Sequence, residues 1–251
     1  FGGNTLLTKK YNGKNIVSLD TDSSGNLWIS ARREGVSLYD RVKDSIIDLS
    51  DMIERVVPGF LNDPLINIHV APDNTVWLYH YTELIALKYT RGNIRLVKRF
   101  KSLPPVISVT SDKEGTLWVG TFSHQIFFLE KGSLTMKSRD LFHPGFVYIP
   151  HILPLSNGSL FIAGFKQNPR ILHPGDMSYE ELDIMHLFPD LPLIPSALME
   201  DSAGIIWMGT VGNGLIKYTP ATGEIIPVRD LSCNDISDLL EDNAGQVWLS
   251  T

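Results

Sequence analysis

The side chains in this sequence that are best suited to chemistry are carboxylates and histidines, and their spacing can be tested for a metal site. The run Asp20-x-Asp22-x-Ser24-Gly25 begins like a calcium-binding loop, which needs a bidentate glutamate at its twelfth position. That position holds Ala31, and no other Asp-x-Asp-x-Ser-Gly run occurs in the sequence. We therefore interpret the run as a turn, and we predict no metal and no cofactor.

The histidine spacing does not favour zinc either. No two of the seven histidines are four residues apart, and the sequence has no His-Glu-x-x-His run. The single Cys233 excludes an internal disulfide and a cysteine-based metal cluster. Two carboxylates that flank one sugar ring would still hydrolyse a glycosidic bond, but spacing along one sequence does not show which carboxylates converge.

Composition narrows the classes of partner. The chain has 251 residues, 43% of them hydrophobic and 20% charged, which is enough apolar material for a sizeable core. Its net charge is −6 and its 22 Lys and Arg residues are scattered, so we expect no nucleic-acid partner. No apolar run is long enough to span a bilayer, so we expect no direct membrane insertion of this region. The sequence begins at Phe1, and we expect it to be part of a longer protein.

The elements that must position any site recur along the whole chain. Each repeat is anchored by an aromatic residue with aliphatic neighbours, and the anchors are 41 to 49 residues apart, about 44 on average. This period is typical of β-propeller blades. The anchors are Trp28, Trp77, Trp118, Phe161, Trp207 and Trp248.

The residues around each anchor predict how one blade is built. Three residues before it stands a residue type that accepts a positive φ in a tight turn, and in four repeats an aspartate six residues before it can bond the backbone amides of that turn. We expect an inner strand before the turn, a buried second strand at the anchor, then a third strand and a more polar edge strand. The four turn aspartates are Asp22, Asp112, Asp201 and Asp242.

We therefore predict an all-β fold, a single β-propeller region of four-stranded antiparallel blades with five complete and two partial units. The opening residues 3–11 match residues 92–100, which predicts an outer strand of a preceding blade. The chain stops after a second strand, so closing a ring would require its ends to join or further blades to be added. The predicted units are an outer strand over 1–11, blades over about 15–49, 64–100, 105–140, 148–184 and 194–230, and a partial blade over 235–251.

Candidate ligand contacts follow from this architecture. The loops from second to third strand, and from the outer strand to the next inner strand, share one face, where propellers commonly bind ligands. Sugars require flat aromatic faces and planar polar groups, so we select five residues in these loops. They are Arg33, Tyr81, His124, Lys166 and Tyr148.

The repeat resembles a known one. The run Asp112-Lys-Glu-Gly115-Thr-Leu-Trp118-Val-Gly120-Thr121 and the run from Asp201 to Thr210 are its cleanest copies, and both are similar to the two-component regulator propeller repeat. The fourth unit departs most, with Leu155 in place of the aspartate and Phe161 in place of the tryptophan. The similarity extends over essentially the whole chain.

The resemblance implies a function. Such repeats form the periplasmic sensor region of hybrid histidine kinase and response regulator proteins of the Bacteroidetes type, which respond to glycans. It implies an oligosaccharide or other small ligand, further blades or domains of the same protein as partners, no catalysis in this region, and kinase activity elsewhere in the parent chain. A propeller enzyme acting on polysaccharide, either glycosidase or lyase, stays open as an alternative. So does a non-catalytic protein-interaction scaffold, and so does a homodimer.

Overall fold

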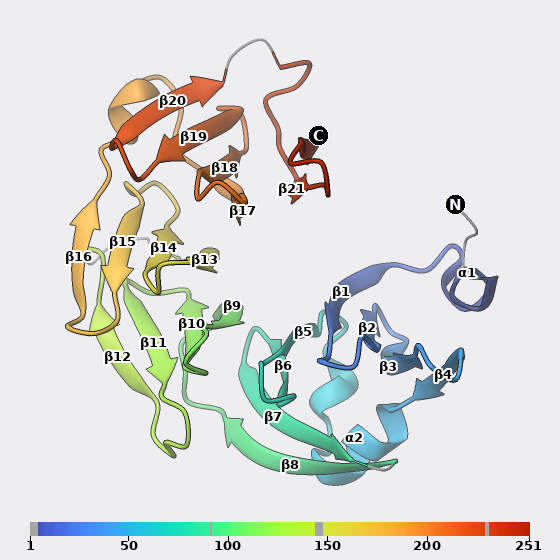
Figure 1. The fold of residues 1–251 in the computed structure, drawn as a ribbon. Coiled ribbons are helices and arrows are strands. Elements are labelled where there is room, and N and C mark those ends of the chain that lie inside the picture. Colours follow the sequence, from blue (N-terminus) through green and yellow to red (C-terminus); the bar gives the residue numbers. More distant parts are fainter. Residues whose placement is uncertain (1–4, 91, 144–147, 229–230) are drawn as a thin grey trace. The chain divides into compact units, whose positions relative to one another are not determined.

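The computed structural model describes residues 5–90, 92–143, 148–228 and 231–251, and the chain forms two compact units, residues 1–106 and 107–251 (Figure 1). The described strands form five four-stranded sheets and one two-stranded sheet, each with strands that are consecutive along the chain. The pairings are antiparallel, which confirms the predicted all-β fold of four-stranded blades.

Among the described residues, unit 1 contains two sheets, two α-helices and one short 3-10 helix. The first sheet is β1 (Ile16–Thr21), β2 (Leu27–Ala31), β3 (Gly35–Asp40) and β4 (Ser45–Asp48). The second is β5 (Asn67–Val70), β6 (Val76–His80), β7 (Glu83–Thr90) and β8 (Asn93–Phe100). The helices are α1 (Thr5–Tyr11), α2 (Ser50–Val56) and the short η1 (Phe60–Asn62).

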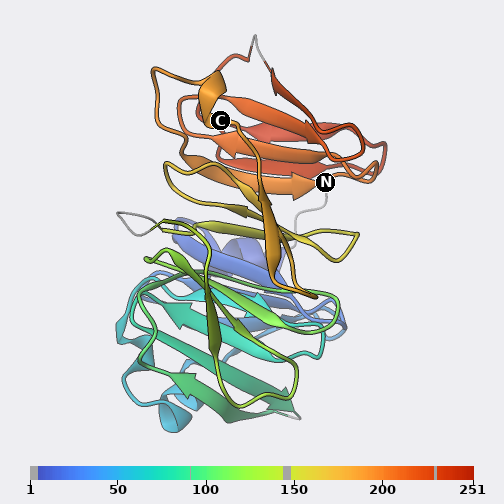
Figure 2. The same cartoon turned by 90° about the vertical axis from the view of Figure 1, so that its left-hand side faces the viewer.

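The remaining sheets belong to unit 2, apart from the first residue of β9. They are β9 (Val106–Ser111), β10 (Leu117–Thr121), β11 (Gln125–Leu129) and β12 (Lys137–Asp140); then β13 (His151–Pro154), β14 (Leu160–Ala163), β15 (Arg170–His173) and β16 (Ser178–Glu181). After η2 (Met185–Leu187) come β17 (Pro195–Glu200), β18 (Ile206–Thr210), β19 (Leu215–Thr219) and β20 (Glu224–Val228), and then the pair β21 (Asp238–Glu241) and β22 (Val247–Ser250). Figure 2 shows the strands of the β17–β20 sheet lying side by side.

The outer strand predicted over residues 1–11 is wrong. Thr5–Tyr11 forms helix α1, and residues 1–4 lie outside the described residues. An edge strand must hydrogen-bond along a neighbouring strand, whereas a helix pairs its backbone groups within itself, and the leucines and lysines of this segment favour helix. The ammonium of Lys10 donates a hydrogen bond to Ser37 Oγ at 3.1 Å, which attaches α1 to β3.

The turns between first and second strands follow the predicted chemistry. All six residues three positions before the anchors have a positive φ, between 59° and 87°. Five of them are glycines, and the sixth is Asn74, a residue type that also tolerates this conformation.

The turn aspartate has a second role that the sequence did not reveal. Asp112 Oδ1 accepts the backbone N–H of Thr116 at 2.8 Å, while its Oδ2 accepts the indole N–H of Trp118 at 2.7 Å. The same carboxylate-to-indole bond, also at 2.7 Å, joins each of the other two pairs, Asp201–Trp207 and Asp242–Trp248. The carboxylate therefore fixes the turn and the anchor together.

The first, second and fourth units lack this bond for different reasons. In the second, Ala71 occupies the position of the aspartate. In the fourth, Leu155 and Phe161 remove the acceptor and the donor together, so neither is left without a partner. In the first, Asp22 Oδ2 instead accepts the side-chain amide of Asn26 at 3.0 Å. The indole nitrogen of Trp28 is buried there and has no hydrogen-bond partner among the described residues, which is a cost to folding.

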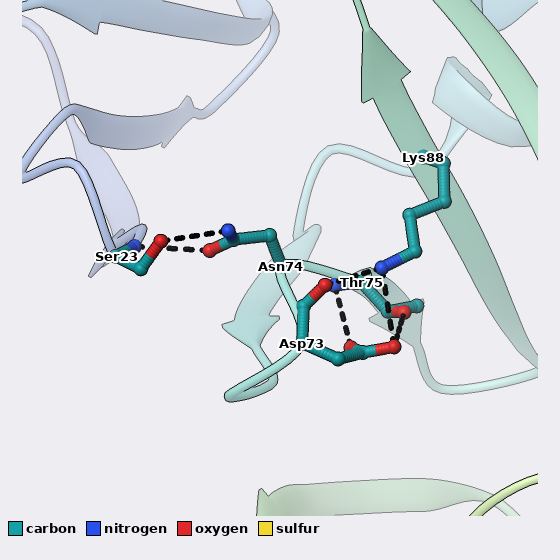
Figure 3. A network of polar contacts seen from close by, with 5 residues as sticks. All are labelled: Ser23, Asp73, Asn74, Thr75 and Lys88. Carbon is teal, nitrogen blue, oxygen red and sulfur yellow. Dashed lines mark hydrogen bonds and ion pairs between the residues drawn. The ribbon is translucent and has the colours of Figure 1, made fainter.

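Neighbouring turns are also joined to each other. Figure 3 shows the turn before β2 meeting the turn before β6: the backbone N–H of Ser23 donates to Asn74 Oδ1 at 2.9 Å, and Asn74 Nδ2 donates to Ser23 Oγ at 2.7 Å. In unit 2, the backbone N–H and hydroxyl of Ser156 donate to the carboxylate of Glu200, both at 2.6 Å. In both units, the residue that follows the turn-aspartate position is thus hydrogen-bonded to the next sheet along the chain.

Within each unit, the core lies between successive sheets. Every residue of β6, β10 and β14 is buried, as predicted for the second strand, and β2 and β18 are buried at all but one residue. For β22 the prediction is wrong, because its residues are half-buried or exposed and Trp248 is 58% exposed. Gly120 shows how closely the sheets approach, because a Cβ there would lie 2.3 Å from the carbonyl oxygen of Ile149. Helix α2 and η1 fill the insertion after β4 and bury Ile53 and Phe60 in the core of unit 1.

We predict that Asp112→Leu lowers the free energy of unfolding by about 3 kcal/mol, because it leaves the Trp118 indole N–H, in a side chain only 1% exposed, without a partner. The double variant with Trp118→Phe copies the fourth unit and should recover part of that loss in urea denaturation. Asp242→Leu is the matched control and should cost below about 1 kcal/mol, since Trp248 is 58% exposed and water can replace the bond. Equal losses at the two positions would contradict this assignment.

Candidate functional site

Three aromatic side chains from successive connections of unit 2 gather in one place. Tyr148 stacks with Phe122, with ring centroids 5.1 Å apart and 17° between the planes, and with Phe165 at 4.7 Å and 18°. We call these three residues the aromatic stack. Each is partly exposed, so the stack presents apolar surface to solvent.

Backbone hydrogen bonds bring the three rings together. The N–H of Phe165 donates to the carbonyl of Tyr148 at 3.0 Å, which continues the pairing of β13 with β14. The N–H of Ile149 donates to the carbonyl of Thr121 at 3.1 Å, which joins this segment to the end of β10. Phe122 follows Thr121 directly, so the stack joins two consecutive blades.

Two of the predicted polar contacts lie in the loops of the stack. Lys166 is exposed, has a φ of 55°, and holds its ammonium 5.1 Å from the centroid of the Phe165 ring. Its backbone N–H donates to the carbonyl of Leu193 at 2.9 Å. His124 lies two residues after Phe122, with Nε2 3.5 Å from Asp140 Oδ1.

The other two predicted residues belong to unit 1. Arg33 is exposed in the loop between β2 and β3, with a φ of 64°. Tyr81 is 52% exposed in the loop between β6 and β7, and its carbonyl accepts the N–H of Val106 at 3.1 Å. The structure thus gathers His124, Tyr148 and Lys166 in the loops of unit 2 and places Arg33 and Tyr81 in loops of unit 1.

Sequence reasoning did not select Phe122 and Phe165. A signal was present, because both stand four residues after an anchor, as does Tyr81. Three successive repeats therefore carry an aromatic residue at one loop position. Comparing repeats by phase would have found them, whereas a search for polar loop residues did not.

Burial raises the pKa of the Tyr148 phenol above its usual range, which is already far above neutral pH, so the hydroxyl keeps its proton at neutral pH. A protonated hydroxyl donates and accepts hydrogen bonds, as the hydroxyls of a sugar also do. The stack therefore combines apolar ring surface, a phenol and the Lys166 ammonium.

A second titratable group, His80, lies at the end of β6 in unit 1. Its Nδ1 is 3.5 Å from Asp63 Oδ2 and 3.2 Å from Thr82 Oγ1, and burial lowers its pKa against the opposing effect of Asp63 and Glu83. A nucleophile–histidine–aspartate relay uses the two ring nitrogens for different partners. Here the hydroxyl and the carboxylate approach the same nitrogen, so these three residues do not form such a relay.

Within the described ranges, no group of three or more His, Cys, Asp or Glu side chains could hold a metal ion. In the same residues, no helix is both long enough and apolar enough to cross a bilayer.

Comparison with known proteins supports the fold and the repeat. Residues 230–251 match the family model of the two component regulator propeller. No curated protein matches the chain. Virginiamycin B lyase from Staphylococcus aureus, in a catalytically inactive form with quinupristin, is a similar solved structure, with a TM-score of 0.74 at 13% identity over 94% of this chain and 78% of that one.

Two receptor ectodomains from B. thetaiotaomicron are also similar. The extracellular domain of a one component system has a TM-score of 0.67 at 18% identity, over 95% of this chain. That of a hybrid two component system has a TM-score of 0.52 at 16% identity, over 94% of this chain. This chain spans 37% of the length of each of them. At these identities the likeness shows the fold, which is a β-propeller.

The burial of His151, the first residue of β13, predicts that acid lowers the stability of the folded chain. Burial lowers its pKa from 6.5 to about 4, against a hydrogen bond to the backbone of Pro195 that raises it. Because the unfolded chain takes up this proton first, stability is full above about pH 6.5 and falls as the pH approaches 4, by about 3 kcal/mol in total.

The His151→Gln variant should lose this part of the pH dependence in urea denaturation between pH 7 and 4. His186→Gln, at an exposed histidine of η2, should leave it unchanged. An undiminished acid-induced loss of stability in His151→Gln would rule out His151 as its source.

Proposed function

We propose that this chain, which carries a two component regulator propeller repeat, is the ligand-sensing extracytoplasmic propeller region of a signalling receptor and binds oligosaccharides at its aromatic stack. The observation that carries the proposal is the gathering of Phe122, Tyr148 and Phe165, partly exposed, in the loops of two consecutive blades. The family match and the likeness to receptor ectodomains support the signalling context.

The chemistry of the stack suits a sugar. Sugar rings present patches of C–H groups that aromatic rings desolvate, and hydroxyls that a few placed polar groups can bond. The Tyr148 hydroxyl and the Lys166 ammonium are such groups beside the rings. Because Phe122 and Phe165 both stack on the Tyr148 ring, we assign the apolar contact to the two phenylalanine rings and the polar contact to the Tyr148 phenol.

The proposal places the region in the periplasm, with further blades or domains of the same protein as its partners and kinase activity elsewhere in the parent protein. Arg33 and Tyr81, in the loops of unit 1, stay candidate ligand contacts. The enzyme alternative has support only in fold, because virginiamycin B lyase is 13% identical to this chain. Asp140, whose carboxylate lies 3.5 Å from His124 Nε2 in the loop of Phe122, also accepts a hydrogen bond from the side-chain amide of Gln125 at 2.7 Å.

The test is calorimetric titration of residues 1–251 with a library of neutral and acidic oligosaccharides. We predict binding by at least one member, weakened about tenfold by Phe122→Leu or Phe165→Leu, since each removes one stacking surface. Phe127→Leu is the matched control, because it makes the same change at a half-buried phenylalanine in the middle of β11 and outside the loops, and it should retain most of the affinity.

Two results would overturn the proposal: no heat change with any oligosaccharide, or a bound one whose affinity is the same in both phenylalanine variants. Release of reducing ends or unsaturated products from polysaccharide would instead favour the propeller enzyme.

A further inference from the structure

We propose that Arg170 is a positioning residue that holds the loop of Phe122 and the loop of Phe165 in place relative to each other. Only its consequence for ligand affinity rests on the proposed function. Arg170 is the first residue of β15. Its position is buried although its side chain is charged, and it is not one of the candidate ligand contacts.

Arg170 is held on several sides. Its residue is 4% exposed, and its Nη2 and Nε donate to Glu181 Oε2 at 2.5 and 3.1 Å across the β15–β16 pair. Its guanidinium carbon lies 4.7 Å from the centroid of the Phe142 ring and 4.5 Å from that of Tyr179. A planar cation that is paired with a carboxylate and stacked on aromatic rings is a contact that arginine makes and lysine does not.

Phe142 connects this arginine to both loops. Its backbone N–H donates to the carbonyl of His124 at 3.0 Å, in the loop that carries Phe122. Its ring lies against Gly164, where an added Cβ would be 3.0 Å from Phe142 Cζ. Gly164 directly precedes Phe165. The Phe142 ring, which Arg170 contacts, therefore touches the start of the loop of Phe165. The Phe142 backbone is hydrogen-bonded to the loop of Phe122.

Glu181 ties the same loop at its far end. Asn168 Nδ2 donates to Glu181 Oε1 at 3.2 Å, and Asn168 Oδ1 accepts the backbone N–H groups of Ile184 and Met185 at 3.0 and 2.8 Å. The hydrogen bond from Arg170 is the largest cause that holds the pKa of Glu181 below its usual range, so this carboxylate stays ionised. The loop with Phe165 and Lys166 is thus held at both ends. The Phe142 ring, which contacts Arg170, lies at its start, and Asn168, which donates to Glu181, lies near its end.

A purely structural arginine would stabilise the sheet without affecting the stack, so the test needs a signal from the stack itself. A 3-fluorotyrosine placed at position 148 reports in its ¹⁹F resonance the ring currents of Phe122 and Phe165. The measurement needs no ligand, which separates this proposal from the proposed function.

We predict that Arg170→Met broadens this resonance and moves its chemical shift towards the value in the urea-unfolded chain. Arg170→Lys should not restore the wild-type resonance, because an ammonium cannot make the planar contact of the guanidinium. Tyr179→Leu removes one ring from the guanidinium at a partly exposed site, and should give a smaller shift in the same direction even where Arg170→Met fails to fold. Lys217→Met, which removes the cation over the Trp207 ring in another blade, is the matched control and should leave the resonance unchanged.

An unchanged resonance in folded Arg170→Met, or in Tyr179→Leu, would overturn the proposal, and so would full restoration by lysine. Where an oligosaccharide binds the wild-type chain, Arg170→Met should weaken it about tenfold. A displaced resonance together with no oligosaccharide binding to any variant would refute the proposed function and leave the positioning role of Arg170 intact.

Discussion

The hydrogen bond from the anchor indole to the turn carboxylate is the constraint that organises the third, fifth and sixth units. One carboxylate accepts turn amides with one oxygen and the indole of a residue six positions later with the other, as in the pair of Asp112 and Trp118. This bond sets the turn and the direction of the buried side chain at once. Because the second strand is only four or five residues long, fixing its turn end also fixes where its loop end emerges. The loop that carries Phe122 begins directly after such a strand.

The blades were predictable because their signals are local and repeated. A glycine or asparagine with positive φ lies three residues before each of the six aromatic anchors, and in four repeats an aspartate lies three residues before that turn residue. Six copies with the same phase leave little room for another fold. The opening segment was not predictable in this way. Its likeness to residues 92–100 concerns side chains, whereas an edge strand depends on a neighbouring strand to pair with, and in α1 the backbone satisfies its own hydrogen bonds.

The candidate site was only partly predictable, for a related reason. Tyr148, His124 and Lys166 were selected as loop residues of suitable chemistry, and the loops that hold them do converge in unit 2. Phe122 and Phe165 were missed because their part depends on contacts between sheets. The contact between the Phe142 ring and Gly164 joins residues 22 positions apart, one in the connection between two blades and the other in the second of these blades, and no local pattern encodes it. Long-range packing of this kind can be read only from the folded chain.

The fourth blade brings these two points together. It is the unit in which Leu155 and Phe161 replace the bonded aspartate and tryptophan, so it lacks the constraint that organises the third, fifth and sixth units. It is also the unit whose loop supplies Phe165 and Lys166, and whose third strand begins with the enclosed Arg170. In this blade the Arg170–Glu181 pair, stacked on Phe142, lies at the loop end of the sheet, whereas in the third and fifth units the carboxylate–indole bond lies at the turn end. We therefore interpret the Arg170 contacts as the interaction that fixes the loop end of the fourth blade, where the loop with Phe165 begins.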